Sequence, residues 1–144
     1  MTAYLDTSAL LKLYVDEAGS DAVWRALDDQ PAATCRITWA EACAALARRE
    51  REFPAAEATW SLARDRLARD WPAFHVIEVT QALVAQAGEF ASVFALRGYD
   101  AVQLAAGRSV QAALDAPPMF LAFDRRLNRA ARLLGLGLPA DAPL

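Results

Sequence analysis

The chain has 144 residues, of which 56% are apolar or aromatic and 23% are charged, and its 15 basic and 18 acidic residues give a formal net charge of −3. This composition excludes a disordered chain, and the length suits one domain, which we expect to span residues 1–144. No apolar run approaches the roughly 18 residues needed to cross a membrane. The N-terminal segment carries no basic leader, so we expect a soluble protein of the cytoplasm with no membrane partner.

The cysteine and histidine content limits the chemistry that the chain can perform. Cys35 and Cys43 lack a CxxC spacing, and His75 is the only histidine. These facts argue against a thiol–imidazole metal site and against catalytic sets built on Cys–His or Ser–His–Asp. Any catalysis must therefore rest on carboxylates, hydroxyls and arginines. Because the net charge is negative, a polyanionic substrate would need local arginine patches or bound cations.

Short apolar runs alternate with helical patterns along the chain, which is typical of βαβ units on a parallel sheet. In chain order we expect a strand over residues 2–6, helices over 8–15 and from residue 20, a strand over 33–37, helices over 38–51 and 54–71, a strand over 74–79, helices over 80–97 and 99–115, a strand over 119–123, a helix over 124–134 and a small edge strand over 135–138. Residues 139–144 are expected to be irregular.

Helix ends are predicted from capping residues. Ser20 and Thr80 are expected to cap the helices that follow them. Thr38 is expected to form a capping box with Glu41, since a Ser or Thr followed three residues later by Glu is the signature of that motif. Gly98 is expected to end the helix before it, because glycine readily adopts the left-handed conformation found after a last turn.

Four acids stand where a predicted strand ends or a predicted helix begins: Asp6, Glu41, Asp100 and Asp124. In an open parallel sheet, the carboxyl ends of the strands and the first turns of the following helices face one crevice. The four carboxylates can therefore gather at one edge of the sheet. Each acid taken alone could instead cap a helix or complement a helix dipole.

Gathered carboxylates repel each other unless a cation neutralises them, and a set of oxygen ligands favours Mg²⁺ or Mn²⁺ over zinc. Without these four acids the chain carries 15 positive and 14 negative charges, a net charge of +1. An acidic metal pocket in an otherwise nearly neutral protein is typical of a phosphoryl-transfer site, where metal ions activate water and stabilise the leaving oxygen.

Four segments carry a more specific signal, and they follow one another over nearly the whole chain: Tyr4-Leu5-Asp6-Thr7-Ser8-Ala9-Leu10; Thr38-Trp39-Ala40-Glu41 with Leu46-Ala47-Arg48-Arg49; Leu96-Arg97-Gly98-Tyr99-Asp100-Ala101-Val102-Gln103-Leu104-Ala105; and Phe123-Asp124-Arg125-Arg126-Leu127 with Ala130-Ala131 and Gly135. In this order they resemble the motifs of the PIN-domain ribonucleases, and among these the VapC-type toxins of bacterial toxin–antitoxin pairs.

The resemblance implies a three-layer α/β/α sandwich around a short parallel sheet of four to five strands. It assigns the catalytic and metal-binding roles to four acids: Asp6, Glu41, Asp100 and Asp124. They would bind one or two Mg²⁺ or Mn²⁺ ions, with the hydroxyl of Ser8, or that of Thr7, near a metal-bound water. The implied reaction is endonucleolytic hydrolysis of RNA. The implied partners are the RNA substrate, a cognate VapB-like antitoxin whose tail covers the active-site groove, and a second copy of the chain in a homodimer.

Some roles and two rival functions stay open at this point. Arg125 and Arg126 could contact substrate phosphates or form a solvated helix face, and Gln103 is assigned no role. The alternative function is a non-catalytic PIN-like module that holds RNA or a protein, and the presence of all four acids argues against it. A phosphotransfer receiver would need a lysine beside the acids, and Lys12, the only lysine, stands in an unsuitable position.

Overall fold

A parallel sheet forms the middle of the molecule. The computed structural model describes residues 2–115 and 117–144. In this part of the chain the sheet has four short strands: β1 (Ala3–Leu5), β2 (Ala32–Cys35), β3 (His75–Ile77) and β4 (Met119–Leu121). Their order is β3-β2-β1-β4, and each strand runs parallel to its neighbour. The predicted parallel α/β fold is thus confirmed.

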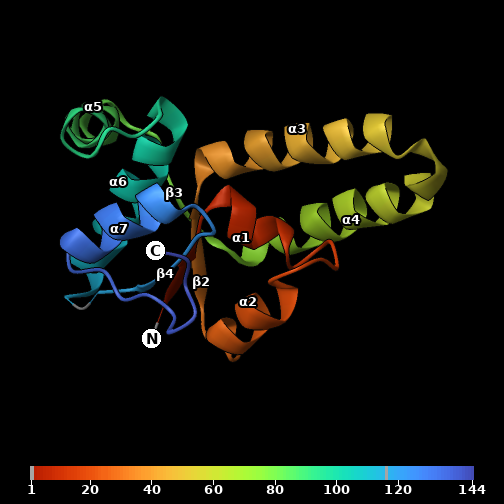
Figure 1. Cartoon of the computed structure of the whole chain (residues 1–144), viewed down its shortest axis with the longest axis horizontal. Helices are drawn as coiled ribbons and strands as arrows, with labels where there is room; N and C mark the ends of the chain where they lie inside the picture. The colour runs from red at the N-terminus through yellow and green to blue at the C-terminus, as the bar shows by residue number, and fades with distance from the viewer. Residues whose placement is uncertain (1, 116) are drawn as a thin grey trace.

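Helices cover both faces of this sheet (Figure 1). In chain order they are α1 (Thr7–Leu11), α2 (Ser20–Leu27), α3 (Arg36–Glu52), α4 (Glu57–Asp70), α5 (Gln81–Phe94), α6 (Gly98–Leu114) and α7 (Arg125–Leu133), with short 3₁₀ turns at Pro54–Ala56 and Trp71–Ala73. Helices α1–α4 pack on one face and α5–α7 on the other, which gives the three layers expected from the resemblance.

The alternation of side chains along β1 explains the two faces. Successive residues of a strand point to opposite sides of a sheet. Ala3 and Leu5 accordingly join the apolar cluster formed with α1–α4, whereas Tyr4 joins the cluster formed with α5–α7. All three side chains are buried, so one short strand contributes to both halves of the core.

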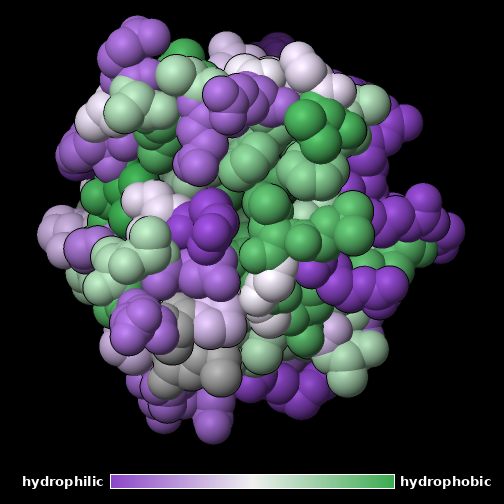
Figure 2. Space-filling model, turned by 90° about the vertical axis from the view of Figure 1, so that its left-hand side faces the viewer, coloured by the Kyte–Doolittle hydropathy of each residue, from purple (hydrophilic) through white to green (hydrophobic). Residues whose placement is uncertain are grey.

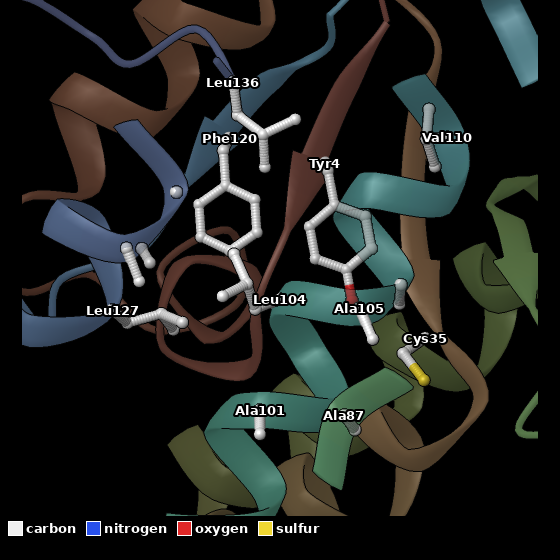
Figure 3. Close-up of a cluster of buried hydrophobic side chains, with 14 of the residues drawn as sticks. Tyr4, Cys35, Ala87, Ala101, Leu104, Ala105, Val110, Phe120, Leu127 and Leu136 are labelled. Carbon is white, nitrogen blue, oxygen red and sulfur yellow. The ribbon is translucent and has the colours of Figure 1, made fainter. Parts of the chain in front are cut away.

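The Tyr4 ring lies against Phe120, its register partner on β4 (Figure 3). The ring centroids are 5.4 Å apart and the planes differ by 9°. Gly107 of α6 lies against the Phe120 ring so closely that a Cβ atom there would be 2.7 Å from two ring carbons. The helix can approach the sheet at this point only because residue 107 has no side chain.

The strand order places the ends of β1 and β4 side by side. The Asp6 N–H donates to the Leu121 carbonyl over 3.1 Å, which continues the parallel ladder one residue beyond β1. The chain passes from β1 to β2 and β3 on one side and returns to β4 on the other, so the reversal of strand order falls at β1. Ligands of open α/β sheets bind at such a point, outside the carboxyl ends of the strands.

Two predicted helix ends are wrong. The N-cap of α2 is Gly19, with φ of 93°, and Ser20 is the first helical residue. The Ser20 hydroxyl instead donates to the Val15 carbonyl and accepts from the Glu17 N–H, so it closes the turn before the helix. At the other site α5 ends at Phe94, and Ala95 takes the left-handed conformation with φ of 53°.

Gly98 opens α6 instead of ending α5. The turn at Ala95 allows the Leu96 N–H to donate to the Ala91 carbonyl and places the Leu96 side chain in the core. Burying a leucine side chain stabilises by roughly 1.5–3 kcal/mol. This gain offsets the cost of about 1–2 kcal/mol for a left-handed alanine.

The predicted capping box of Thr38 with Glu41 is also wrong. Helix α3 begins at Arg36, with Cys35 as its N-cap, so Glu41 lies in the second turn. Thr38 is fully buried, and its hydroxyl bonds to Thr34 and to the Gln103 amide rather than to the start of the helix. A tertiary contact has thus replaced the local motif.

The predicted edge strand over 135–138 is reduced to a single parallel bridge between Met119 and Gly137. On the face at the side of α5–α7, hydrophobic side chains are interspersed with hydrophilic ones (Figure 2). Exposed apolar residues of these helices include Val84, Val93 and Tyr99. Within the residues that the structure describes, none of the helices combines the length and the apolar character needed to cross a bilayer.

The close contact between α6 and Phe120 yields a stability prediction. Gly107→Ala is expected to lower the free energy of unfolding, because overpacking costs about 1–3 kcal/mol and outweighs the helix-propensity gain of about 1 kcal/mol. Gly88→Ala in α5 is the matched control, since its Cβ would meet nothing within 4 Å, and it is expected to stabilise. Urea denaturation of the three proteins measures both effects. Equal stabilisation by the two substitutions would contradict the packing argument.

Candidate functional site

Asp6 lies at the end of β1 and caps α1. Its Oδ1 accepts from the Ala9 N–H over 2.9 Å and from the Ser8 hydroxyl over 2.7 Å. The residue is only 6% exposed. The pKa of the Asp6 carboxyl is raised from 3.8 to about 7, mainly because the group is buried. The charges of Asp100 and Glu41 contribute to this rise, and the two hydrogen bonds act against it.

The hydroxyls of Thr7 and Ser8 connect Asp6 to its surroundings. The Ser8 hydroxyl donates to Asp6 and accepts from the Phe123 N–H over 3.2 Å, so it joins the segments that follow β1 and β4. The Thr7 hydroxyl donates to Glu41 Oε1 over 2.8 Å. Both predicted hydroxyls therefore contact a predicted acid, one each.

Glu41 is half-buried on α3, where that helix passes α1. Its Oε1 accepts from the Thr7 hydroxyl and from the Gln103 amide nitrogen, each over 2.8 Å. Among the described residues it forms no ion pair. Neutral donors thus hold one oxygen of this carboxylate and leave its charge uncompensated.

Asp100 and Asp124 come from the other side of the sheet. Asp100 lies in the first turn of α6; burial raises the pKa of its carboxyl, the charges of Asp124 and Glu41 raise it further, and Arg97 lowers it. Asp124 is exposed and caps α7, accepting from the Leu127 N–H over 2.8 Å. It fills the capping role that its position after β4 predicted.

The structure brings three of the acids into mutual electrostatic range: Asp6, Glu41 and Asp100. Asp124 interacts electrostatically with Asp100 and is linked to this group through it. Over residues 2–115 and 117–144, however, no three acidic, cysteine or histidine side chains lie close enough together to hold a metal ion as they stand. Repulsion separates like charges, and hydrogen bonds within the protein engage an oxygen of Asp6, of Glu41 and of Asp124. That all four acids bind metal stays a prediction.

The chemistry of these side chains nevertheless suits a divalent cation. The donors are carboxylate and hydroxyl oxygens, the ligands that Mg²⁺ and Mn²⁺ prefer. No ion pair within the described residues involves any of the four acids. Two of the carboxyls have raised pKa values, which means that the site is electrostatically costly without added positive charge.

A pocket of about 430 Å³ adjoins Asp100 and Asp124, and four arginines line it with Phe123: Arg97, Arg125, Arg126 and Arg129. Arg126 donates to the Ala95 carbonyl over 3.0 Å and is held in place there. Arg125 and Arg126 are the two arginines predicted from the sequence, and both line the pocket. Arg97 and Arg129 were not predicted, although the helical spacing of residues 125 and 129 places them on the same face of α7.

Gln103 is a further residue of the site that the sequence did not predict. It is 2% exposed on α6, and its amide contacts Tyr4, Glu41, Thr38 and Thr7. The available signal was its spacing, because residues 100 and 103 lie on the same side of a helix. A polar residue on the buried side of an apolar helix needs hydrogen-bond partners, and here these include a site acid.

The fold and this arrangement of acids agree with a comparison to known families. The family model of the PIN domain matches residues 3–133. The chain therefore belongs to the PIN-domain family.

Curated relatives narrow the assignment. The chain is 34% identical over 135 residues to Ribonuclease VapC45 and to Ribonuclease VapC49, from two strains of Mycobacterium tuberculosis, and the match covers 92% of this chain and 90% of each relative. The chain is thus a VapC-type PIN-domain protein, as the resemblance of its motifs implied. A solved structure, a toxin–antitoxin complex from Klebsiella pneumoniae, shares the fold with a TM-score of 0.58 and 20% identity over 85% of this chain and 86% of that one.

The raised pKa of Asp6 predicts how stability depends on pH. From about pH 4 to about pH 7 the unfolded chain loses the Asp6 proton while the folded chain keeps it, so this group lowers the free energy of unfolding by about 1.4 kcal/mol per pH unit. Asp6→Asn keeps a capping oxygen and removes this loss. The variant is expected to be stabilised by a few kcal/mol at pH 8 and to be close to wild type at pH 4.

Urea denaturation in EDTA at pH 4, 6 and 8 measures this difference. Thr80→Ala, which removes the uncharged cap of α5, is the control and is expected to cost about 1 kcal/mol at every pH. An Asp6→Asn effect that does not change between pH 4 and pH 8 would show that the carboxyl has no raised pKa.

Proposed function

We propose that this protein is a metal-dependent endoribonuclease that hydrolyses RNA phosphodiester bonds and acts as the toxin of a toxin–antitoxin pair. The observation that carries the proposal is the group of carboxylates beside the end of β1, which forms no ion pair among the described residues. The names of the VapC relatives, which are ribonucleases, support the same reaction. We further propose that residues 1–144 form one PIN-like domain.

Four acids would hold one or two Mg²⁺ or Mn²⁺ ions: Asp6, Glu41, Asp100 and Asp124. When bound, such ions supply Lewis-acid stabilisation of the developing charge and lower the pKa of water. The chain's own residues keep the carboxylates ready. Asp6 is fixed by its cap bond and by Ser8, and Glu41 by Thr7. The Ser8 hydroxyl, which lies between Asp6 and the segment after β4, is also the group we expect to orient the attacking water.

The arginine-lined pocket is the proposed path of the RNA backbone. Arg97, Arg125 and Arg129 form no ion pair within the described part of the chain, so their guanidinium groups are available to phosphates. Guanidinium groups bind phosphate oxygens through paired N–H donors. A phosphate bound here would place its neighbour beside Asp100 and Asp124, which line the same pocket.

The proposed partners follow from the VapC assignment. We expect a cognate VapB-like antitoxin to silence the nuclease, and we expect the chain to form a homodimer in the cytoplasm. The toxin–antitoxin complex that shares this fold is consistent with the first expectation. The exposed apolar side chains of α5 and α6, such as Val93 and Tyr99, offer a surface that subunit contact would bury.

Asp100→Asn is expected to lower cleavage of total RNA in Mg²⁺ or Mn²⁺ by more than about a hundred-fold, because metal stabilisation of the transition state amounts to several kcal/mol. Its fold should be retained, since the substitution removes a partly buried charge that other carboxylates repel. Cleavage by the wild type should cease in EDTA. Fragment analysis on sequencing gels and thermal denaturation measure the two properties.

Asp115→Asn, at the far end of α6, is the matched control and is expected to cleave as the wild type does. Full cleavage by folded Asp100→Asn, or cleavage by the wild type that persists in EDTA, would contradict the proposed metal site. Intact RNA with metal-loaded, antitoxin-free wild type would favour the non-catalytic binding module.

The arginine pocket makes a separate prediction about substrate binding. In the inactive Asp100→Asn background, Arg129→Ala is expected to weaken RNA binding about threefold to tenfold and to reduce the log–log salt slope by roughly 0.7, the value for one lost contact to a single strand. Arg132→Ala is the matched control, because Arg132 also lies exposed on α7 but does not line the pocket. Fluorescence anisotropy over a range of salt concentrations measures both. Equal effects of the two substitutions would place the RNA elsewhere.

A further inference from the structure

The amide of Gln103 lies at the centre of a buried polar network beneath the acids. Its Oε1 accepts from the Tyr4 hydroxyl over 2.6 Å. Its Nε2 donates to Glu41 Oε1 over 2.8 Å and to Thr38 Oγ1 over 2.9 Å, and Thr7 Oγ1 lies at 3.2 Å from the same nitrogen. Both ends of the amide are therefore satisfied inside the protein.

The hydrogen bonds fix which way this amide points. The Thr34 hydroxyl has one proton, and the Leu5 carbonyl, at 2.8 Å, can only accept it. The 2.9 Å bond between Thr34 and Thr38 must then be donated by Thr38, which leaves the Thr38 oxygen to accept from Gln103. An ionised Glu41 can likewise only accept. Nε2 must face Glu41 and Thr38, and Oε1 must face Tyr4.

We propose that Gln103 is a positioning residue that holds the Glu41 carboxylate in the orientation needed to bind the divalent cation, an inference that rests on the proposed function. Gln103 and Thr7 both donate to the same oxygen, Oε1. No hydrogen bond to Oε2 is formed by any of the residues that the structure describes. The second oxygen of Glu41 is thus available to bind a cation together with the acidic group that contains Asp6 and Asp100.

A neutral donor suits this task better than a basic residue would. A lysine or arginine at this position would orient Glu41 but would also cancel the charge that attracts a cation. The glutamine amide orients the Glu41 carboxylate without neutralising its charge. Groups that hold metal ligands in this way typically change metal affinity by about ten- to a hundred-fold when they are removed.

The amount of buried polar surface also argues for a purpose beyond packing. Gln103 lies among the buried apolar residues of α6, which include Ala101 and Leu104, and an apolar side chain there would avoid burying an amide. The sequence instead places Tyr4, Thr38 and Thr34 around it, so that each polar atom finds a partner. Fully satisfied networks of this kind hold side chains rigidly.

The test compares Mn²⁺ binding by the full chain and by Gln103→Met, which keeps the volume and removes the amide. Titration calorimetry is expected to show binding weakened about ten- to a hundred-fold. At saturating Mn²⁺, Gln103→Met should cleave RNA with most of the wild-type kcat, because the substitution changes the concentration of metal that is required. Gln111→Met is the matched control, because Gln111 is a half-buried residue of the same helix whose side chain accepts from Arg108 and, within the described residues, bonds to none of the site acids. It is expected to bind Mn²⁺ as the wild type does.

Tyr4→Phe provides a second variant that keeps the ring stacked on Phe120 and removes only the hydroxyl that holds the amide. It is expected to weaken Mn²⁺ binding in the same direction but less, and to add nothing to Gln103→Met in the double variant. Thermal denaturation without metal reports the folded fraction of each protein, so that affinities are compared per folded molecule.

The outcomes separate this inference from the proposed function. Folded Gln103→Met that binds Mn²⁺ as tightly as the wild type, or that weakens no more than Gln111→Met, would overturn the positioning role and leave the nuclease proposal intact. Wild type that binds no Mn²⁺ would overturn both. A selective loss in Gln103→Met and Tyr4→Phe would support both.

Discussion

Burial of the Asp6 carboxyl beside other acids is the constraint on which the rest of the site depends. Taking a carboxylate out of water is expensive, and the nearby charges of Asp100 and Glu41 add to the cost. The protein offsets part of it with the Ala9 N–H and the Ser8 hydroxyl. All of these donors are neutral, so they orient the carboxylate and leave the negative potential for a cation to neutralise. The uncompensated charge makes the metal-free fold less stable, as expected of a binding site.

The sheet explains why these acids meet at all. The strands have only three or four residues, and β1 lies between β2 and β4. Tyr4 is paired with Phe120 in the register of β1 against β4 and stacks on it, and in this register Asp6 and the segment that leads to Asp124 leave the sheet together. The same tyrosine presents its hydroxyl to Gln103 on α6. One residue of the core therefore joins the packing of the sheet to the geometry of the site.

The role of a residue could be predicted from the sequence where the signal is local. Asp6 and Asp124 each follow a short apolar run and precede a helix, and each caps that helix in the structure. The same local logic failed for Thr38, whose capping-box spacing is correct but whose hydroxyl is drawn into the core by contacts with Thr34 and Gln103. The partners of Gln103 lie 62 to 99 positions away in the chain, so no short pattern can reveal them. Only the packing of α6 on the sheet brings them together.

The arginines around Asp124 are difficult to explain by helix stability. Arg125 and Arg126 occupy the first positions of α7, where the helix dipole favours acids and disfavours bases by about 0.3–1 kcal/mol each. Basic residues at positions where the helix dipole disfavours them need another explanation. Binding of a phosphate near the acidic group provides one. A protein with a net charge of −3 attracts a polyanion through its local field rather than its total charge. Four arginines create that field beside Asp100 and Asp124. The substrate is therefore attracted to the edge of the site, and the cation to its interior.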